Sequence, residues 1–79
     1  MFLEIVTPEE TLYGNEIKYV KVPGSNGQFG VLKNHAPVIS TLEKGQIKVE
    51  EKDGTKKFFD IKGGVIEVLN NNIIILLKL

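Results

Sequence analysis

The sequence predicts an all-β protein: a flattened β-sandwich or barrel of about eight to ten short strands, with no long helix. Apolar and polar residues alternate with a period of two through most of the chain, which is typical of half-buried strands. Glycine, proline and asparagine repeatedly interrupt this alternation and mark turns. Nowhere does an apolar stripe with helical spacing persist for three turns, so we expect no long helix.

The first two strands are predicted from alternation. In the first, Leu3 and Ile5 point to one face of the sheet. In the second, the same period puts Ile17 and Tyr19 on one face and Val20 on the other.

A glycine-rich segment, Val22–Pro37, follows the second strand. Gly24, Gly27 and Gly30 recur at a spacing of three, and Val31–Lys33 then looks like a further strand. Phosphate-binding loops need a different glycine pattern that opens a helix, so a phosphate site is not expected here. The segment predicts a tightly shaped loop on a rigid scaffold, which is where a partner is commonly bound.

Two hairpins are predicted in the second half of the chain. Asp53-Gly54 separates the apolar-periodic stretches 47–52 and 55–61, which favours a two-residue turn with positive φ at both positions. Asn70-Asn71-Asn72 separates 65–69 from 73–77, and asparagine tolerates the left-handed conformation that such a turn requires.

The run Ile73–Leu77 is apolar at every position. A strand of this kind is expected to be covered on both faces. One face then belongs to the internal core, and the other is expected to meet a partner or a neighbouring loop.

Composition excludes several classes of function. The 79 residues are expected to form one domain, 1–79, with ten basic and ten acidic side chains, no arginine, no cysteine and one histidine. Disulfides and a structural zinc site are therefore excluded, and no nucleic-acid partner is expected. A chain of this size buries only about 60% of its unfolded surface, so docking to another subunit would add stability. The start of the chain does not resemble a signal peptide, and its longest apolar run is far below the roughly 20 residues of a membrane helix.

No catalytic constellation is recognisable. His35 is expected to be a hydrogen-bonded turn residue, because the two serines, Ser25 and Ser40, lie in the same short region and offer no triad. Glu50-Glu51 point to opposite faces and are expected to pair with Lys56-Lys57 across a hairpin on a solvated face. We therefore expect no enzymatic activity, no cofactor and no metal.

Three segments in order carry a family resemblance: Val22-x-Gly24-x-x-Gly27-x-x-Gly30-Val31-Leu32-x-x-His35-Ala36-Pro37, then Leu42-x-x-Gly45-x-Ile47, then Gly63-Gly64-Val65-Ile66-Glu67-Val68. Together they resemble the amino-terminal β-sandwich domain of epsilon subunits of rotary F-type ATP synthases. The resemblance spans essentially the whole chain.

The resemblance implies a non-catalytic rotor subunit that docks on the gamma subunit and on the polar loops of the c-subunit ring, coupling proton flow to ATP synthesis. It implies a peripheral position on the cytoplasmic face of a bacterial inner membrane. The residues expected to contact the c ring are Ser25, Asn26, Gly27, Gln28 and Phe29. The residues expected to contact gamma are Thr7, His35 and Thr41.

The sequence departs from the family pattern at three places. Asn34 replaces a glycine before His-Ala-Pro, and the turn is expected to survive because asparagine visits positive φ readily. Gln28 stands where the family often has an acid. Family members usually continue into a helical hairpin, whereas this sequence ends at Leu79. If 79 residues are the whole natural product, the expectation is coupling without inhibition of ATP hydrolysis by a tail, and no nucleotide binding.

Two other classes stay open on the residues alone. One is a free-standing β module that binds a peptide or a sugar, and this would want an aromatic-lined groove. The other is a small enzyme, which would need polar groups converging in a pocket.

Overall fold

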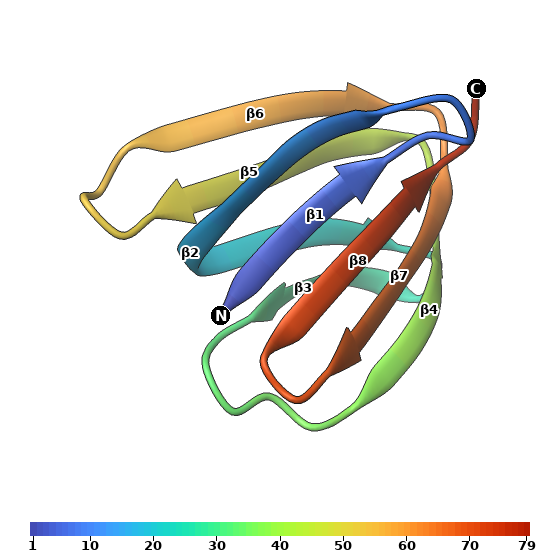
Figure 1. Cartoon of the computed structure of the whole chain (residues 1–79). Coiled ribbons are helices and arrows are strands. Elements are labelled where there is room, and N and C mark those ends of the chain that lie inside the picture. The colour runs from blue at the N-terminus through green and yellow to red at the C-terminus, as the bar shows by residue number, and fades with distance from the viewer.

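The computed structural model of residues 1–79 contains eight strands and no helix (Figure 1). The strands are β1 (Phe2–Val6), β2 (Thr11–Gly24), β3 (Gly27–Val31), β4 (Val38–Leu42), β5 (Gly45–Glu51), β6 (Lys56–Ile61), β7 (Gly64–Leu69) and β8 (Asn72–Leu77). This confirms the all-β prediction and its strand number.

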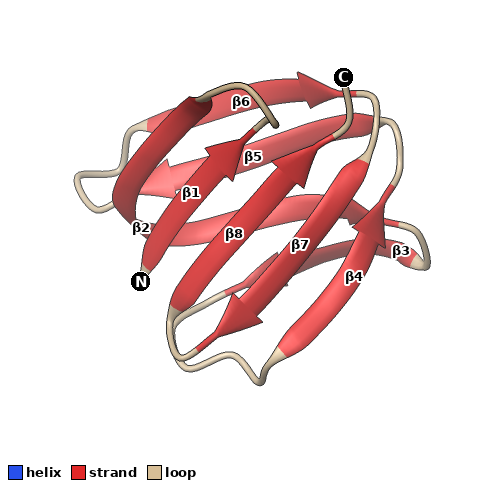
Figure 2. Cartoon of the chain, turned by 45° about the vertical axis from the view of Figure 1, so that its right-hand side comes forward, coloured by secondary structure: helices blue, strands red, loops and turns tan.

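The strands form two layers that share the long strand β2 (Figures 1 and 2). The front sheet has the order β4-β7-β8-β1 and ends on the first half of β2. The back sheet contains β3, the second half of β2, β5 and β6. Strands β1 and β8 are parallel, and the other pairings are antiparallel. A single residue pair, Gly24 with Leu42, joins β2 to β4, so the sandwich is also a nearly closed, flattened barrel.

The predicted faces of β2 are wrong on one side of a bulge. The register with β5 shifts between Ile17 and Tyr19. An inserted residue reverses the facing of every side chain that follows it. Ile17 and Val20 are consequently both buried, whereas Tyr19 is only half-buried.

The core consists of aliphatic side chains from both sheets, and no polar or charged side chain is buried with them. Leu3 and Ile5 are among them, as the alternation predicts. The full set is Leu3, Ile5, Ile17, Val20, Val22, Val31, Leu42, Ile47, Val49, Ile61, Ile66, Val68, Ile73 and Ile75.

The glycine-rich segment is a hairpin rather than a free loop. Strand β2 runs to Gly24 and β3 begins at Gly27, so the turn itself is Ser25-Asn26. The predicted strand at 31–33 is wrong, because β3 ends at Val31.

Two of the three glycines in this hairpin are required by packing. A Cβ at Gly24 would collide with the ring of Phe29, 2.7 Å from one of its carbons. A Cβ at Gly30 would collide with the ring of Tyr19. Of the three positions, only 27 requires glycine for its backbone conformation, because Gly27 has a φ of 118°.

The β5–β6 hairpin differs from its prediction. Its loop has three residues, Lys52-Asp53-Gly54, and only Gly54 has a positive φ, 91°. The amide of Gly54 donates to the carbonyl of Glu51 at 2.9 Å, and the amide of Glu51 donates to the carbonyl of Thr55 at 2.8 Å. This is a turn followed by a left-handed glycine, the usual form of a three-residue hairpin loop.

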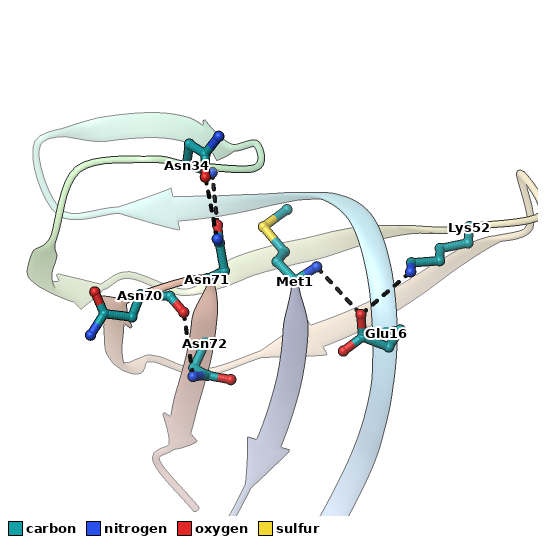
Figure 3. Close-up of polar contacts among 7 residues, drawn as sticks. All are labelled: Met1, Glu16, Asn34, Lys52, Asn70, Asn71 and Asn72. Carbon is teal, nitrogen blue, oxygen red and sulfur yellow. Dashed lines mark hydrogen bonds and ion pairs between the residues drawn. The ribbon is translucent and has the colours of Figure 1, made fainter.

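The β7–β8 hairpin confirms the asparagine prediction. Asn70 and Asn71 form the turn with φ of 51° and 62°, and Asn72 begins β8 (Figure 3). Positive φ at both central residues gives the turn the twist that the flanking strands require.

Glu51 does not lie on a solvated face as predicted. Its side chain is only 14% exposed, and it accepts hydrogen bonds from the hydroxyl of Tyr13 at 2.5 Å and from the side-chain amide of Asn15 at 3.2 Å. Lys57 lies 3.9 Å away, as the predicted cross-strand partner. The ring of Phe59 packs edge-on against Tyr13, with 5.4 Å between centroids. These contacts close one corner of the sandwich.

This corner predicts a loss of stability in alkali. Burial, and then the hydrogen bond to Glu51, raises the pKa of Tyr13 from 10.0 to about 12. Between these two pH values the folded chain holds a proton that the unfolded chain has lost. The contribution of Tyr13 to the free energy of unfolding is therefore fully present below pH 10 and is lost as the pH rises towards 12. Denaturant unfolding measured between pH 10 and 12 should show that the free energy of unfolding falls in the wild type and falls less in Tyr13→Phe. Equal slopes in the two proteins would contradict it.

Candidate docking surfaces

The solvent side of the front sheet presents two rows of side chains brought together by strand pairing. In one row, Ile39 pairs with Glu67, Glu67 with Ile74, and Ile74 with Glu4. In the next row, Thr41 pairs with Val65, Val65 with Leu76, and Leu76 with Val6. Residues paired in this way point to the same side of a sheet. We call the set Ile39, Val65, Glu67, Ile74 and Leu76 the outer face.

The outer face is open, and four of its five side chains are aliphatic, with the exposed Glu67 between Ile39 and Ile74. Ile39 is 72% exposed, and Ile74 and Leu76 are 43% and 45% exposed. The outer face lines a shallow hollow of about 340 Å³. The inner residues of the run Ile73–Leu77 belong to the core, as expected. No loop of residues 1–79 covers the other face, so of the two expected covers only a partner stays a prediction.

A polar network holds the Ser25-Asn26 turn against β4. The hydroxyl of Ser25 donates to a carboxylate oxygen of Glu43 at 3.0 Å and lies 2.6 Å from the hydroxyl of Thr41. A serine hydroxyl has one proton, so Thr41 is the donor in the shorter contact. The amide of Ser25 also donates to the carbonyl of Thr41 at 3.0 Å.

The residues expected to contact the c ring fall into two groups. Ser25, Asn26, Gly27 and Gln28 are exposed at the tip of the β2–β3 hairpin. Phe29 is half-buried, and its ring packs over Gly24 and against the hydrophobic core. Phe29 therefore supports this turn from within.

The residues expected to contact gamma do not touch one another. Thr41 lies in β4, in a row of the front sheet that ends on Val6, and Thr7 directly follows that residue. The hydroxyl of Thr7 accepts from the amides of Glu9 and Glu10 at 3.2 and 3.1 Å, which shapes the β1–β2 loop.

His35 lies in the loop between β3 and β4, near the β7–β8 turn. Nδ1 of His35 donates to the carbonyl of Ala36 at 2.7 Å, and the amide of His35 donates to the carbonyl of Leu32 at 3.1 Å. The prediction of a hydrogen-bonded turn residue is thus confirmed.

The loop that carries His35 is tied to the front sheet by two asparagines (Figure 3). The amide of Asn34 donates to the side chain of Asn71 at 2.7 Å, and the side-chain amide of Asn71 donates back to Asn34 at 3.3 Å. Asn34 has φ of 66°, as predicted for the residue in place of the family glycine.

Thr41→Val is expected to loosen the Ser25-Asn26 turn, because valine keeps the shape of threonine but cannot donate to Ser25. Hydrogen exchange of the turn amides should quicken by about tenfold, the effect of losing a hydrogen bond of about 1.4 kcal/mol. Thr41→Ser should restore the wild-type rate, and Thr55→Val in the β5–β6 hairpin is the matched control. Unchanged exchange in Thr41→Val would refute a holding role for the network.

Neither surface contains a group of three or more histidine, aspartate or glutamate side chains placed to hold a metal ion. The chain contains no helix long and apolar enough to cross a membrane.

Comparison with known proteins gives a consistent family. Residues 1–78 match the family described as ATP synthase, Delta/Epsilon chain, beta-sandwich domain. The ATP synthase epsilon chain of Campylobacter hominis is 47% identical over 77 residues, which is 96% of this chain and 59% of the relative. That of Caulobacter vibrioides is 46% identical over 69 residues, covering 86% of this chain and 78% of the relative.

A solved structure supports the same assignment. A chain in the Euglena gracilis mitochondrial ATP synthase structure, which comprises OSCP, F1 and the c ring, matches with a TM-score of 0.89 and 25% identity. The match covers 95% of this chain and 48% of that one. This chain thus spans between half and three-fifths of the length of the first relatives it matches. By sequence and by fold, the chain belongs to the family of ATP synthase delta/epsilon chains, of which it comprises the β-sandwich domain.

Proposed function

We propose that this chain is a non-catalytic part of the central stalk of a proton-translocating F-type ATP synthase. In this proposal the outer face docks on the gamma subunit, and the Ser25-Asn26 turn docks on the polar loops of the c ring. The domain then joins the stalk to the proton-driven ring at the cytoplasmic face of a bacterial inner membrane.

The outer face is the observation that carries this proposal. Its four aliphatic side chains are all more than a third exposed, and they come from three adjacent strands. A contiguous apolar patch on a small soluble domain marks a site of interaction. Covering it would add apolar burial to a chain that is short of it.

The expected gamma contacts lie at the margins of the outer face. Thr41 shares a row with Val65 and Leu76, and Thr7 follows the strand at the far end of that row. His35 lies near the opposite end of the sheet, because its neighbour Asn34 is hydrogen-bonded to Asn71 in the β7–β8 turn. A partner that spans the outer face would therefore reach all three, although they are not in contact with one another.

The Ser25-Asn26 turn supports a different kind of contact. Ser25 is engaged by Thr41 and Glu43, so Asn26 and Gln28 are the exposed polar side chains that remain available. Both are neutral, so their contacts with the c ring should depend little on salt.

Cross-linking tests the placement of this turn. The chain has no cysteine, so Asn26→Cys and Gln28→Cys each introduce a unique thiol. In the assembled synthase, both are expected to form disulfides with cysteines in the polar loops of the c subunit. Asp53→Cys, in the turn of the β5–β6 hairpin, is the control and is expected to form none. A cross-link from position 53 but not from 26 or 28 would refute the proposed orientation.

A further inference from the structure

The largest cleft of the chain lies at the edge of the front sheet where β4 ends, β7 begins and β8 ends. It has a volume of about 580 Å³, within the usual range for ligand sites. The turn after β4, the turn before β7 and the end of β8 line it. Gly63 and Gly64 contribute backbone without side chains to its wall, and the amide of Lys78 donates to the carbonyl of Gly63 at 2.9 Å.

Positive charge gathers at this cleft. Lys44, Lys62 and Lys78 line it, and none of them has an ion-pair partner within the chain. The one acid in the lining is Glu43, whose carboxylate accepts a hydrogen bond from Ser25. Three unpaired ammonium groups around one cavity repel one another and favour an anion.

The cleft and the outer face are continuous. Val65 and Leu76 line both the cleft and the hollow of the outer face. A protein that covers the outer face would therefore extend directly over the lysines. Ammonium groups that are partly desolvated in this way need a counter-charge, because a buried unpaired charge is costly.

We infer that this cleft receives a carboxylate side chain of the protein that docks on the outer face. The inference rests on the proposed function, in which that protein is the gamma subunit. The apolar contacts of the outer face then supply most of the affinity, and the lysine–carboxylate contact fixes the orientation of gamma on the front sheet. An aspartate or glutamate is the expected group, since the cleft adjoins a surface suited to protein packing.

The test is a double charge reversal measured against purified gamma subunit. Lys44→Glu/Lys62→Glu should weaken binding by about tenfold at low salt, and the difference should shrink as salt screens the charges. The control is Lys21→Glu/Lys56→Glu, which makes the same change of net charge on exposed lysines of the back sheet. Its affinity should stay within about twofold of the wild type at every salt concentration.

A second double variant separates lost attraction from added repulsion. Lys44→Met/Lys62→Met should also weaken binding at low salt, by less than the charge reversal. Equal effects in the cleft and control variants, or no effect in the cleft variants, would overturn the inference and leave gamma docking intact. Failure of the wild type to bind gamma would overturn the proposed docking itself. Thermal unfolding of each variant, all at exposed positions, confirms that the fold is retained.

Discussion

Ile74→Lys is expected to lower the affinity of this chain for the gamma subunit by about a hundredfold, the effect of removing a central apolar contact of about 2.7 kcal/mol. Ile74 lies in the middle of the outer face, paired with Glu67 on one side and with Glu4 on the other. Lysine there would remove the branched apolar side chain, and its ammonium group would be attracted to the carboxylates of Glu67 and Glu4 instead of packing against gamma. Its exposure of 43% means that the isolated domain should keep its melting temperature within a few degrees.

Phe58→Lys is the matched control for this substitution. Phe58 is 53% exposed on β6 in the back sheet, away from the outer face. The same loss of an exposed apolar residue should leave the affinity for gamma unchanged. If Phe58→Lys weakens binding as strongly as Ile74→Lys does, gamma docks elsewhere and the assignment of the outer face fails. Equilibrium titration of labelled gamma with each variant gives both values.

Gly64→Ala is expected to destabilise the fold by about 3 kcal/mol, a large part of the stability of a small domain. The added Cβ would collide with the backbone carbonyl oxygen of Leu76 and lie 3.2 Å from the Cα of Leu77. Neither is the flexible end of a side chain, so β7 and β8 must separate locally. A shift of this size should lower the melting temperature by more than 10 °C, at roughly 4–8 °C per kcal/mol for a domain of this length.

Gly14→Ala is the corresponding control in β2. Its added Cβ would meet only the ring edge of Phe2 at 3.7 Å, an ordinary van der Waals distance, and its φ is not positive. Its melting temperature should equal or slightly exceed that of the wild type, because alanine restricts the unfolded chain more than glycine does. Calorimetry of the two variants side by side tests the argument, and equal melting temperatures would contradict it.

Several local features could be predicted because neighbouring residues decide them. The alternation around Leu3 and Ile5 indicates their buried face, and Asn70-Asn71 indicates the turn between the last two strands. Asn34 was predicted to keep a positive φ, and it does. Each of these depends on backbone conformations that the side chain itself favours, within a few positions along the chain.

Other local predictions failed where a distant contact overrides the pattern. The bulge beside Tyr19 is visible only in the pairing of β2 with β5. Gly24 and Gly30 suggested a shaped loop, but they are glycines because the rings of Phe29 and Tyr19 cover them. Glu51 resembled a solvated partner of lysine, and its hydrogen bond to Tyr13 joins residues 38 positions apart.

The candidate site divides in the same way. The sequence indicated the segment around Ser25, and it indicated that one side of the run Ile73–Leu77 would meet a partner or a neighbouring loop. It did not indicate Ile39, Val65 or the lysine-lined cleft as parts of a surface. Ile39 and Ile74 become neighbours of Glu67 only when β4, β7 and β8 pair in that order.

By itself, the sequence determined the all-β class, the asparagine turn and the buried face of the first strand, because a period of two and turn chemistry are properties of adjacent residues. The tertiary structure alone decided which strands are neighbours, where β2 passes from one sheet to the other, and which apolar side chains stay uncovered. These features depend on pairing between segments that are distant in the sequence. The free energy gained by burying apolar surface scales with the area removed from water, and not with the sequence separation of the residues that meet. The outer face exists for that reason: one side of β7 and β8 fills the core, and none of the eight strands packs over the other side.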